Sequence, residues 1–250
     1  MVPSISIQVS EVNYRALVQL GIPHKLIEKD AETAEIPLPD FWTIPEVNYR
    51  GKTLTADLSK KLLPPRTQQQ HAEHRNSAGK NEFVSADMPF YFSMYRALFE
   101  QRDKLEIAEE ARDFIQRAMR QRFLSTLTRP AYSPRGKDRV IHNYGTNDRY
   151  DIKANIVGPD GLIKSRDKGT LNALLGTGDV RIINNVYNWL NVTNASIYRF
   201  NEKPQELTEV VARFVANPGD ARLDCNGRPD FVDPSLGVRI NARSAPSTKK

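Results

Sequence analysis

Sulfur and long apolar runs are scarce in this chain of 250 residues. Cys225 is its only cysteine, which excludes an intramolecular disulfide and any zinc site built from several thiolates. No apolar stretch approaches the roughly twenty residues that a helix needs to cross a bilayer. The first twenty residues also lack the basic start and the long apolar run of a signal peptide. We therefore expect a cytoplasmic protein that does not work in a membrane.

The composition favours a folded, basic protein. Hydrophobic residues make up 39% of the chain, which is enough for the core of one large domain or of two small ones. The 36 basic residues exceed the 30 acidic ones, so the formal net charge is +6 and the isoelectric point is near 9.4. A surplus of positive charge favours polyanionic partners without requiring them.

The distribution of apolar residues divides the chain into four parts. Residues 1–63 predict an N-terminal α+β segment, in which prolines near Trp42 favour extended backbone. Residues 64–83 contain almost no side chain able to contribute to a core, which is typical of a linker or a long surface loop. Residues 84–243 predict the main α+β domain, and residues 244–250 form a basic tail.

Helical periodicity is clearest in the middle of the chain. Residues 88–101 and 103–127 predict helices. In the second, apolar side chains from Leu105 to Phe123 recur at spacings of three and four, so they share one face. We expect two more helices, at residues 179–190 and 204–217.

Strand signals appear after residue 150. Alternation over residues 150–157, a Gly-Pro-Asp-Gly turn and residues 162–165 together predict a β-hairpin. Residues 195–200 predict another strand. The expected class is α+β, with an extended and helical N-terminal segment, central amphipathic helices, and a mixed antiparallel sheet with helices in the C-terminal half.

Positive charge is concentrated in one part of the chain. The segment from Arg112 to Arg139 carries a net charge of +6, equal to that of the whole chain. Guanidinium groups form bidentate contacts with phosphates, and neighbouring aromatic rings stack on unpaired bases. The residues that we expect to contact nucleic acid are Arg117, Arg120, Arg122, Arg129, Tyr132, Arg135, Lys137 and Arg139.

The leading hypothesis is a non-enzymatic nucleic-acid-binding protein or ribonucleoprotein component that needs no cofactor. No motif that reads bases is present. Arginines at the end of a helix also have a simpler role, because positive charge there complements the helix dipole. The simpler interpretation is a solvated helix face followed by a loop.

A metal-assisted hydrolase or phosphoryl-transfer enzyme is the first alternative. His142, Asp148 and Asp151 could bind a divalent metal or share acid-base chemistry. Their spacing matches no familiar motif, and the asparagine, glycine and aspartate residues around them are ordinary turn formers. The second alternative is a structural subunit of a larger assembly, with exposed aromatic residues that pack against protein partners, namely Trp42, Phe90, Tyr91 and Phe92.

Two weaker signals have ordinary explanations. His71 and His74 could face the same metal from one helical turn, but they lack the spacing of a zinc-protease motif and lie in the predicted linker. Gly176 and Gly178 could approach a phosphate. A helix that ends at Gly176, followed by a helix capped by Asp179, is the simpler interpretation.

Overall fold

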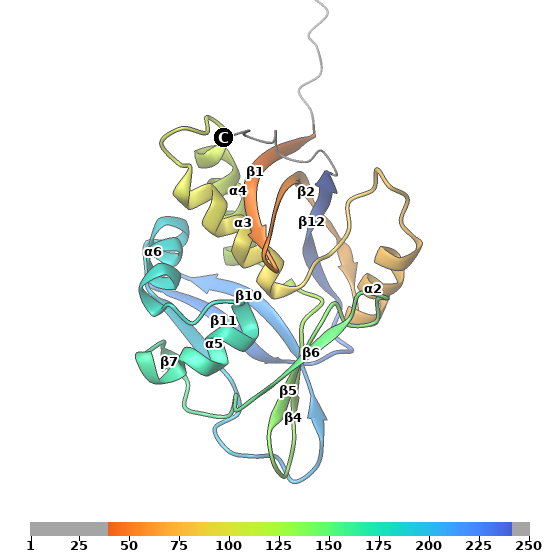
Figure 1. The fold of residues 1–250 in the computed structure, drawn as a ribbon, viewed down its shortest axis with the longest axis vertical. Helices are drawn as coiled ribbons and strands as arrows, with labels where there is room; N and C mark the ends of the chain where they lie inside the picture. Colours follow the sequence, from red (N-terminus) through yellow and green to blue (C-terminus); the bar gives the residue numbers. More distant parts are fainter. Residues whose placement is uncertain (1–39, 242–250) are drawn as a thin grey trace, which may run out of the picture. The chain divides into compact units, whose positions relative to one another are not determined.

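The computed structural model describes residues 40–241, which fold as an α+β protein, as the sequence predicts. Residues 1–39 and the tail 244–250 lie outside the described residues. Five α-helices and three β-sheets make up the described part (Figure 1). The helices are α2 (Gln68–Ser77), α3 (Met88–Glu100), α4 (Ala108–Gln121), α5 (Lys168–Leu175) and α6 (Val180–Asn191). None of these helices is both long and apolar enough to cross a membrane.

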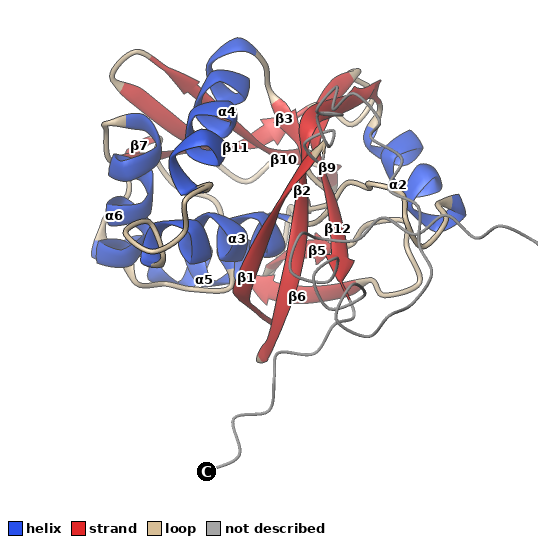
Figure 2. Cartoon of the chain, turned by 90° about the horizontal axis from the view of Figure 1, so that it is seen from above, coloured by secondary structure: helices blue, strands red, loops and turns tan. Residues whose placement is uncertain are grey.

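The first sheet is antiparallel and has the order β1-β2-β12. Its strands are β1 (Phe41–Tyr49), β2 (Lys52–Arg66) and β12 (Asp233–Asn241). Arg50 and Gly51 form the turn between β1 and β2. Figure 2 shows α3, α4, α5 and α6 on one side of this sheet and α2 on the other.

The second sheet is mixed, because β8 and β11 are parallel while the other pairs are antiparallel. Its order is β3 (Leu124–Ser125), β10 (Val211–Asn217), β11 (Asp220–Gly227), β8 (Ala195–Tyr198) and β7 (Gly161–Leu162). The helix predicted at residues 204–217 is wrong, since this stretch forms β9 (Thr208–Glu209) and β10. Every residue from Val210 to Ala216 is buried. A strand buried on both faces lacks the alternation that distinguishes strand from helix.

The third sheet is antiparallel and has the order β6-β5-β4-β9. Its further strands are β4 (Arg129–Tyr132), β5 (Asp138–His142) and β6 (Tyr150–Ala154). The strand predicted from residue 150 is present, but the hairpin with residues 162–165 is wrong, because β6 pairs with β5 and β7 with β8. The Asp160 carboxylate accepts a hydrogen bond from the backbone N–H of Arg199 at 2.8 Å. This bond holds the predicted turn against the end of β8.

Residues 64–83, predicted as a linker, contain the end of β2 and helix α2. The Gln68 side chain is buried, and its Nε2 donates to the carbonyl oxygens of Thr126 and Thr128 at 3.0 and 3.1 Å. Hydrogen bonds of a polar side chain therefore attach α2 to the rest of the fold. A pattern of apolar residues does not indicate such an attachment.

Helix α3 occupies the centre of the core. Nine of its thirteen residues are buried, as expected for a helix that is apolar nearly all round. Its rings contact two of the sheets, with Phe90 against Tyr49 of β1 at 5.2 Å and Tyr95 against Phe214 of β10 at 5.3 Å between ring centroids. The helix thus bridges the first and second sheets.

The aromatic residues proposed for a subunit interface belong to this core. Trp42, Phe90, Tyr91 and Phe92 are between 1% and 4% exposed. The prediction that they are free to pack against other proteins is wrong. Three of them are buried residues of α3 itself. Trp42 packs beneath α4, where its indole N–H donates to Glu110 at 2.9 Å.

Two core tyrosines provide a matched test of hydrogen bonding. Tyr91 Oη accepts from the Ala86 backbone N–H at 2.9 Å and donates to the Leu236 carbonyl oxygen at 2.7 Å. The buried Tyr95 hydroxyl has no partner among the described residues. We expect Tyr91→Phe to lower the free energy of unfolding by about 1–3 kcal/mol, because it leaves buried backbone groups unsatisfied, and Tyr95→Phe to leave it unchanged or raise it. Urea unfolding measures both values, and equal losses in the two variants would contradict this expectation.

Candidate functional site

His142 and Asp151 lie on opposite faces of the third sheet. In the register of β5 and β6, Tyr150 pairs with His142 and Asp151 pairs with Ile141. Adjacent residues of a strand point to opposite faces. His142 is fully buried, whereas Asp151 is exposed. The two side chains therefore cannot act on one metal or one substrate.

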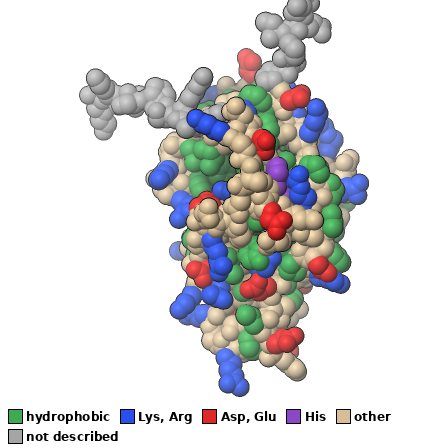
Figure 3. Space-filling view, turned by 90° about the vertical axis from the view of Figure 1, so that its right-hand side faces the viewer, with side chains coloured by type: hydrophobic (Ala, Val, Ile, Leu, Met, Phe, Trp, Pro, Cys, Tyr) green, Lys and Arg blue, Asp and Glu red, His purple; other side chains and the backbone are tan. Residues whose placement is uncertain are grey.

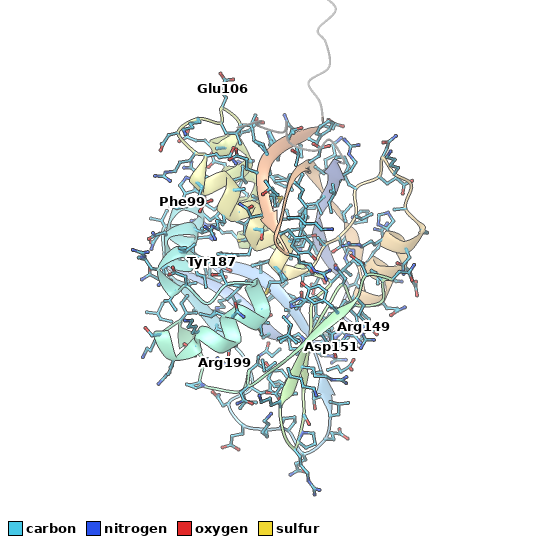
Figure 4. All side chains as sticks on the ribbon, viewed as in Figure 1. Phe99, Glu106, Arg149, Asp151, Tyr187 and Arg199 are labelled. Carbon is cyan, nitrogen blue, oxygen red and sulfur yellow. The ribbon has the colours of Figure 1, made fainter. Side chains whose placement is uncertain are left out.

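The two aspartates of the enzyme hypothesis are partners of arginines. Asp151 lies 3.6 Å from Arg139, and Asp148 lies 3.2 Å from Arg75. Figure 4 shows Asp151 near the start of β6. Within residues 40–241, no group of three or more histidine, cysteine, aspartate or glutamate side chains could hold a metal ion. The structure thus does not form the proposed site from His142, Asp148 and Asp151.

His142 instead joins several elements of the core. Its Nε2 donates to the Ala173 carbonyl oxygen at 2.8 Å, because a carbonyl can only accept. Its Nδ1 then accepts from the Thr128 hydroxyl at 3.0 Å, and that hydroxyl accepts from the Met88 backbone N–H at 2.9 Å. Burial lowers the pKa of His142 below its ordinary value. The neutral imidazole links β5, α5, the residue before β4 and the start of α3.

Asp87 completes this buried polar cluster. One carboxylate oxygen accepts from the Phe90 backbone N–H at 2.9 Å and caps α3, while the other accepts from the Tyr49 hydroxyl at 2.7 Å. The Tyr150 hydroxyl lies 3.5 Å from this second oxygen. Burial raises the pKa of the Asp87 carboxyl, and the hydrogen bonds from Tyr49 and Phe90 oppose that rise. The carboxylate therefore holds α3, β1 and β6 together.

His71 and His74 are not brought into a metal site. Nε2 of His71 donates to the Asp233 carbonyl oxygen at 2.9 Å. Burial, and to a smaller extent the nearby charge of Arg66, lowers the pKa of both imidazoles. A guanidinium beside the pair disfavours the binding of a second cation.

The basic segment of residues 112–139 divides into two surfaces. Residues 124–132, between its halves, are all buried. Its exposed members among the predicted contacts are Arg117, Arg120 and Arg122 at the end of α4, and Arg135 and Lys137 at the tip of the hairpin between β4 and β5. This tip is the lower end of the ribbon in Figure 1, whereas α4 lies in the upper half. In Figure 3, basic side chains mark the lower end, and acidic and basic side chains are mixed above it.

Arg129 and Tyr132 belong to the core rather than to either surface. Tyr132 stacks on Phe200 with 4.4 Å between ring centroids and donates its hydroxyl to the Cys225 carbonyl oxygen at 2.8 Å. Arg129 is 8% exposed and pairs with Glu209 at 2.9 Å. We leave both out of the candidate interface.

Two exposed aromatic side chains that the apolar pattern does not indicate lie shortly after α4 and in the loop between β11 and β12. Phe123 is 42% exposed, and the Arg213 guanidinium lies 4.3 Å from its ring centroid. Phe231, between β11 and β12, is 49% exposed, and Arg228, which pairs with Asp230 at 2.5 Å, lies 4.8 Å from its ring centroid. We define the arginine–aromatic surface as Arg117, Arg120, Arg122, Phe123, Arg228 and Phe231.

Arg213 connects the two parts of the arginine–aromatic surface. Besides contacting Phe123, it pairs with Asp224 at 2.6 Å and with Asp233 at 2.9 Å. The absence of a side chain at Gly227 leaves room for the Arg213 guanidinium. Gly227 and Asp233 flank the loop that carries Phe231, so this loop and Phe123 are held by the same guanidinium.

The exposure of Phe123 follows from where α4 ends. The apolar spacing of the sequence predicts that Phe123 lies on the buried face of a helix. Helix α4 ends at Gln121, and Arg122 is extended with φ −146° and ψ 154°, so Phe123 leaves that face. Its position directly after a run of arginines is a signal that sequence reasoning could have used. Phe231 offers no such signal.

The arginines of α4 differ in their partners. Arg112 pairs with Asp113 at 2.8 Å. Arg117, Arg120 and Arg122 make no ion pair with any residue in the range 40–241. Their guanidinium donors are available to an external acceptor.

The protonation of His142 predicts a loss of stability in acid. Because its pKa is lower in the folded chain than the ordinary value of 6.5, the unfolded chain binds more protons between those two pKa values. The contribution of the neutral His142 to the free energy of unfolding is therefore fully present above pH 6.5 and falls as the pH drops below this value. We expect His142→Gln, which keeps a donor for the Ala173 carbonyl, to take up about one proton fewer on unfolding than the wild type below this pH. Urea unfolding at a series of pH values measures the slope, and an unchanged slope would refute this role.

Comparison of the chain with protein-family models, with curated proteins and with solved structures found no match.

Proposed function

We propose that this protein binds nucleic acid through the arginine–aromatic surface. One observation carries the proposal: three exposed arginines without ion-pair partners in residues 40–241 lie at the end of α4, directly before an exposed phenylalanine. Arginine offers a planar set of donors that matches a phosphate, and an aromatic face offers a platform for a base.

The chemistry of this surface favours single-stranded nucleic acid. A base that is already unpaired stacks on Phe123 or Phe231 without first leaving a duplex. Phe123 directly follows the unpaired Arg122, which suits contacts that alternate between base and phosphate, whereas Arg213 and Arg228, which lie on the rings of Phe123 and Phe231, are already paired with carboxylates. The chain carries no recognised base-reading motif, so we expect little sequence preference.

The tip of the hairpin between β4 and β5 is a second phosphate contact in this proposal. Arg135 and Lys137 are exposed and make no ion pair with any described residue, whereas Arg139 is held by Asp151. The hairpin carries no exposed aromatic residue, so it contributes charge alone. Separate variants of the two surfaces assign the contribution of each.

We expect Arg120→Gln combined with Arg122→Gln to weaken the binding of single-stranded oligonucleotides at low salt. The plot of log affinity against log salt concentration should lose about 0.7 in slope for each phosphate contact removed. Fluorescence anisotropy over a series of salt concentrations measures both quantities.

A matched control removes the same charge elsewhere. Arg166 and Arg181 are exposed and make no ion pair with a described residue. Arg166→Gln combined with Arg181→Gln should retain the wild-type salt slope. If the control and the α4 variant lose equal affinity, only net charge matters and the proposed surface is refuted.

The aromatic part of the surface has its own test. We expect Phe123→Ala to weaken single-strand binding by about 1–3 kcal/mol, because it removes a stacking platform. Leu162 is 59% exposed on β7, and Leu162→Ala should have no effect. Titration of a single strand and of its duplex distinguishes stacking from charge, since a loss of equal size for both would show that Phe123 does not stack on unpaired bases.

A further inference from the structure

A pocket lies on the β1–β2 side of α3, well apart in the sequence from the arginine–aromatic surface. Its volume is about 370 Å³, within the range typical of small-molecule sites. Residues of the β1–β2 turn, α3, β6 and the end of α5 line it. Its apolar lining includes Pro89 and Phe92 of α3 and Leu175 of α5, and its neutral polar lining includes Ser93 and Asn172.

Two tyrosines give this pocket a rigid wall. Tyr49 and Tyr150 line it with their rings, while their hydroxyls are directed to the Asp87 carboxylate at 2.7 and 3.5 Å. The Tyr150 ring also lies between His142, at 4.8 Å from centroid to centroid, and the Arg50 guanidinium, at 4.0 Å. Its faces are therefore already in use, and it supports Arg50 rather than stacking on a ligand.

The charged residues that line the pocket differ in whether they form ion pairs. Arg96 and Glu100 pair with each other at 2.7 Å. Arg50 and Glu46 also line the pocket, are exposed to solvent, carry opposite charges, and form no ion pair with each other or with another described residue. One unpaired cation and one unpaired anion therefore remain at a single pocket.

The backbone holds these two residues in an unusual conformation. Glu46 has φ 57° and Arg50 has φ 51°, and only four non-glycine residues in the range 40–241 have positive φ. Such conformations cost free energy for residues with a Cβ atom, and they concentrate at ligand-binding sites. The β-bulge between Ile44 and Val47 places Glu46, and the tight turn places Arg50.

We propose that this pocket binds a small zwitterion of amino-acid type. Its carboxylate pairs with the Arg50 guanidinium, its ammonium group pairs with Glu46, and its apolar side chain packs against Ile152, a half-buried residue of the lining. Arg50 forms bidentate hydrogen bonds with a carboxylate, and the stacking on Tyr150 orients its guanidinium. The proposal is independent of nucleic-acid binding.

Three probes separate the two charged contacts. Leucine carries both charges, 4-methylpentanoate lacks the ammonium group, and 3-methylbutylamine lacks the carboxylate. We expect leucine to bind at least about tenfold more tightly than either of the others, which corresponds to about 1.4 kcal/mol. Ligand-observed NMR titration of the full chain measures all three affinities.

Two variants assign the contacts to residues. Arg50→Gln should weaken leucine and 4-methylpentanoate and leave 3-methylbutylamine unchanged, whereas Glu46→Gln should weaken leucine and 3-methylbutylamine and leave 4-methylpentanoate unchanged. Lys52→Gln, in the same hairpin but outside the pocket, is the matched control and should bind all three as the wild type does. Arg50→Lys keeps the charge but not the bidentate geometry, so it should also weaken leucine and 4-methylpentanoate, which tests the contact if Arg50→Gln does not fold.

Three outcomes would overturn the proposal. The first is the absence of saturable leucine binding at millimolar concentration. The second is equal affinity for leucine and 4-methylpentanoate, which would indicate a site for anions only. The third is an unchanged leucine affinity in both Glu46→Gln and Arg50→Gln. None of these results affects the nucleic-acid proposal, since the variants lie outside the arginine–aromatic surface.

Discussion

The buried Asp87 carboxylate holds the central helix against two of the three sheets. It accepts from the first turn of α3, from Tyr49 of β1 at 2.7 Å, and approaches the Tyr150 hydroxyl of β6 at 3.5 Å. A buried carboxylate is costly without such donors. Because each donor comes from a different element, the carboxylate is satisfied only when all three elements are in place. The same bonds turn the two tyrosine rings into a wall of the pocket, so the geometry proposed for ligand binding depends on a contact inside the core.

Arginines serve two separate purposes in this chain. Arg199 pairs with Asp167 at 2.7 Å, and Arg213 pairs with Asp224 at 2.6 Å, in each case with both side chains buried. These pairs fix loops and strands of the second sheet. Arg120 and Arg122 are exposed and have no such partner in the described residues. Charge alone does not distinguish the two kinds of arginine, whereas burial and partners do.

Local signals in the sequence were sufficient for several elements. Asp87 and Asp179 cap α3 and α6, and both helices begin directly after these residues. Gly176 ends α5 with φ 76°, a conformation that glycine adopts without strain. The apolar stripe of α4 and the turn at Arg50 and Gly51 are also local patterns, and both are present in the structure. Helix caps, turns and the α+β class could therefore be predicted from short-range chemistry.

Contacts between residues distant in the sequence determined the remaining elements. Helix α2 depends on Gln68 reaching carbonyl oxygens about 60 residues away, so its own composition resembles a loop. Strand β10 is buried on both faces, which removes the alternation that would identify it. The sequence by itself determined several helix caps and turns, and where positive charge is concentrated. Only the tertiary structure decided which strand pairs with which, that Tyr132 is buried while Phe123 is exposed, and that Glu46 and Arg50 share a pocket. Capping and turn formation act within a few residues, whereas burial and pairing depend on the whole packed chain.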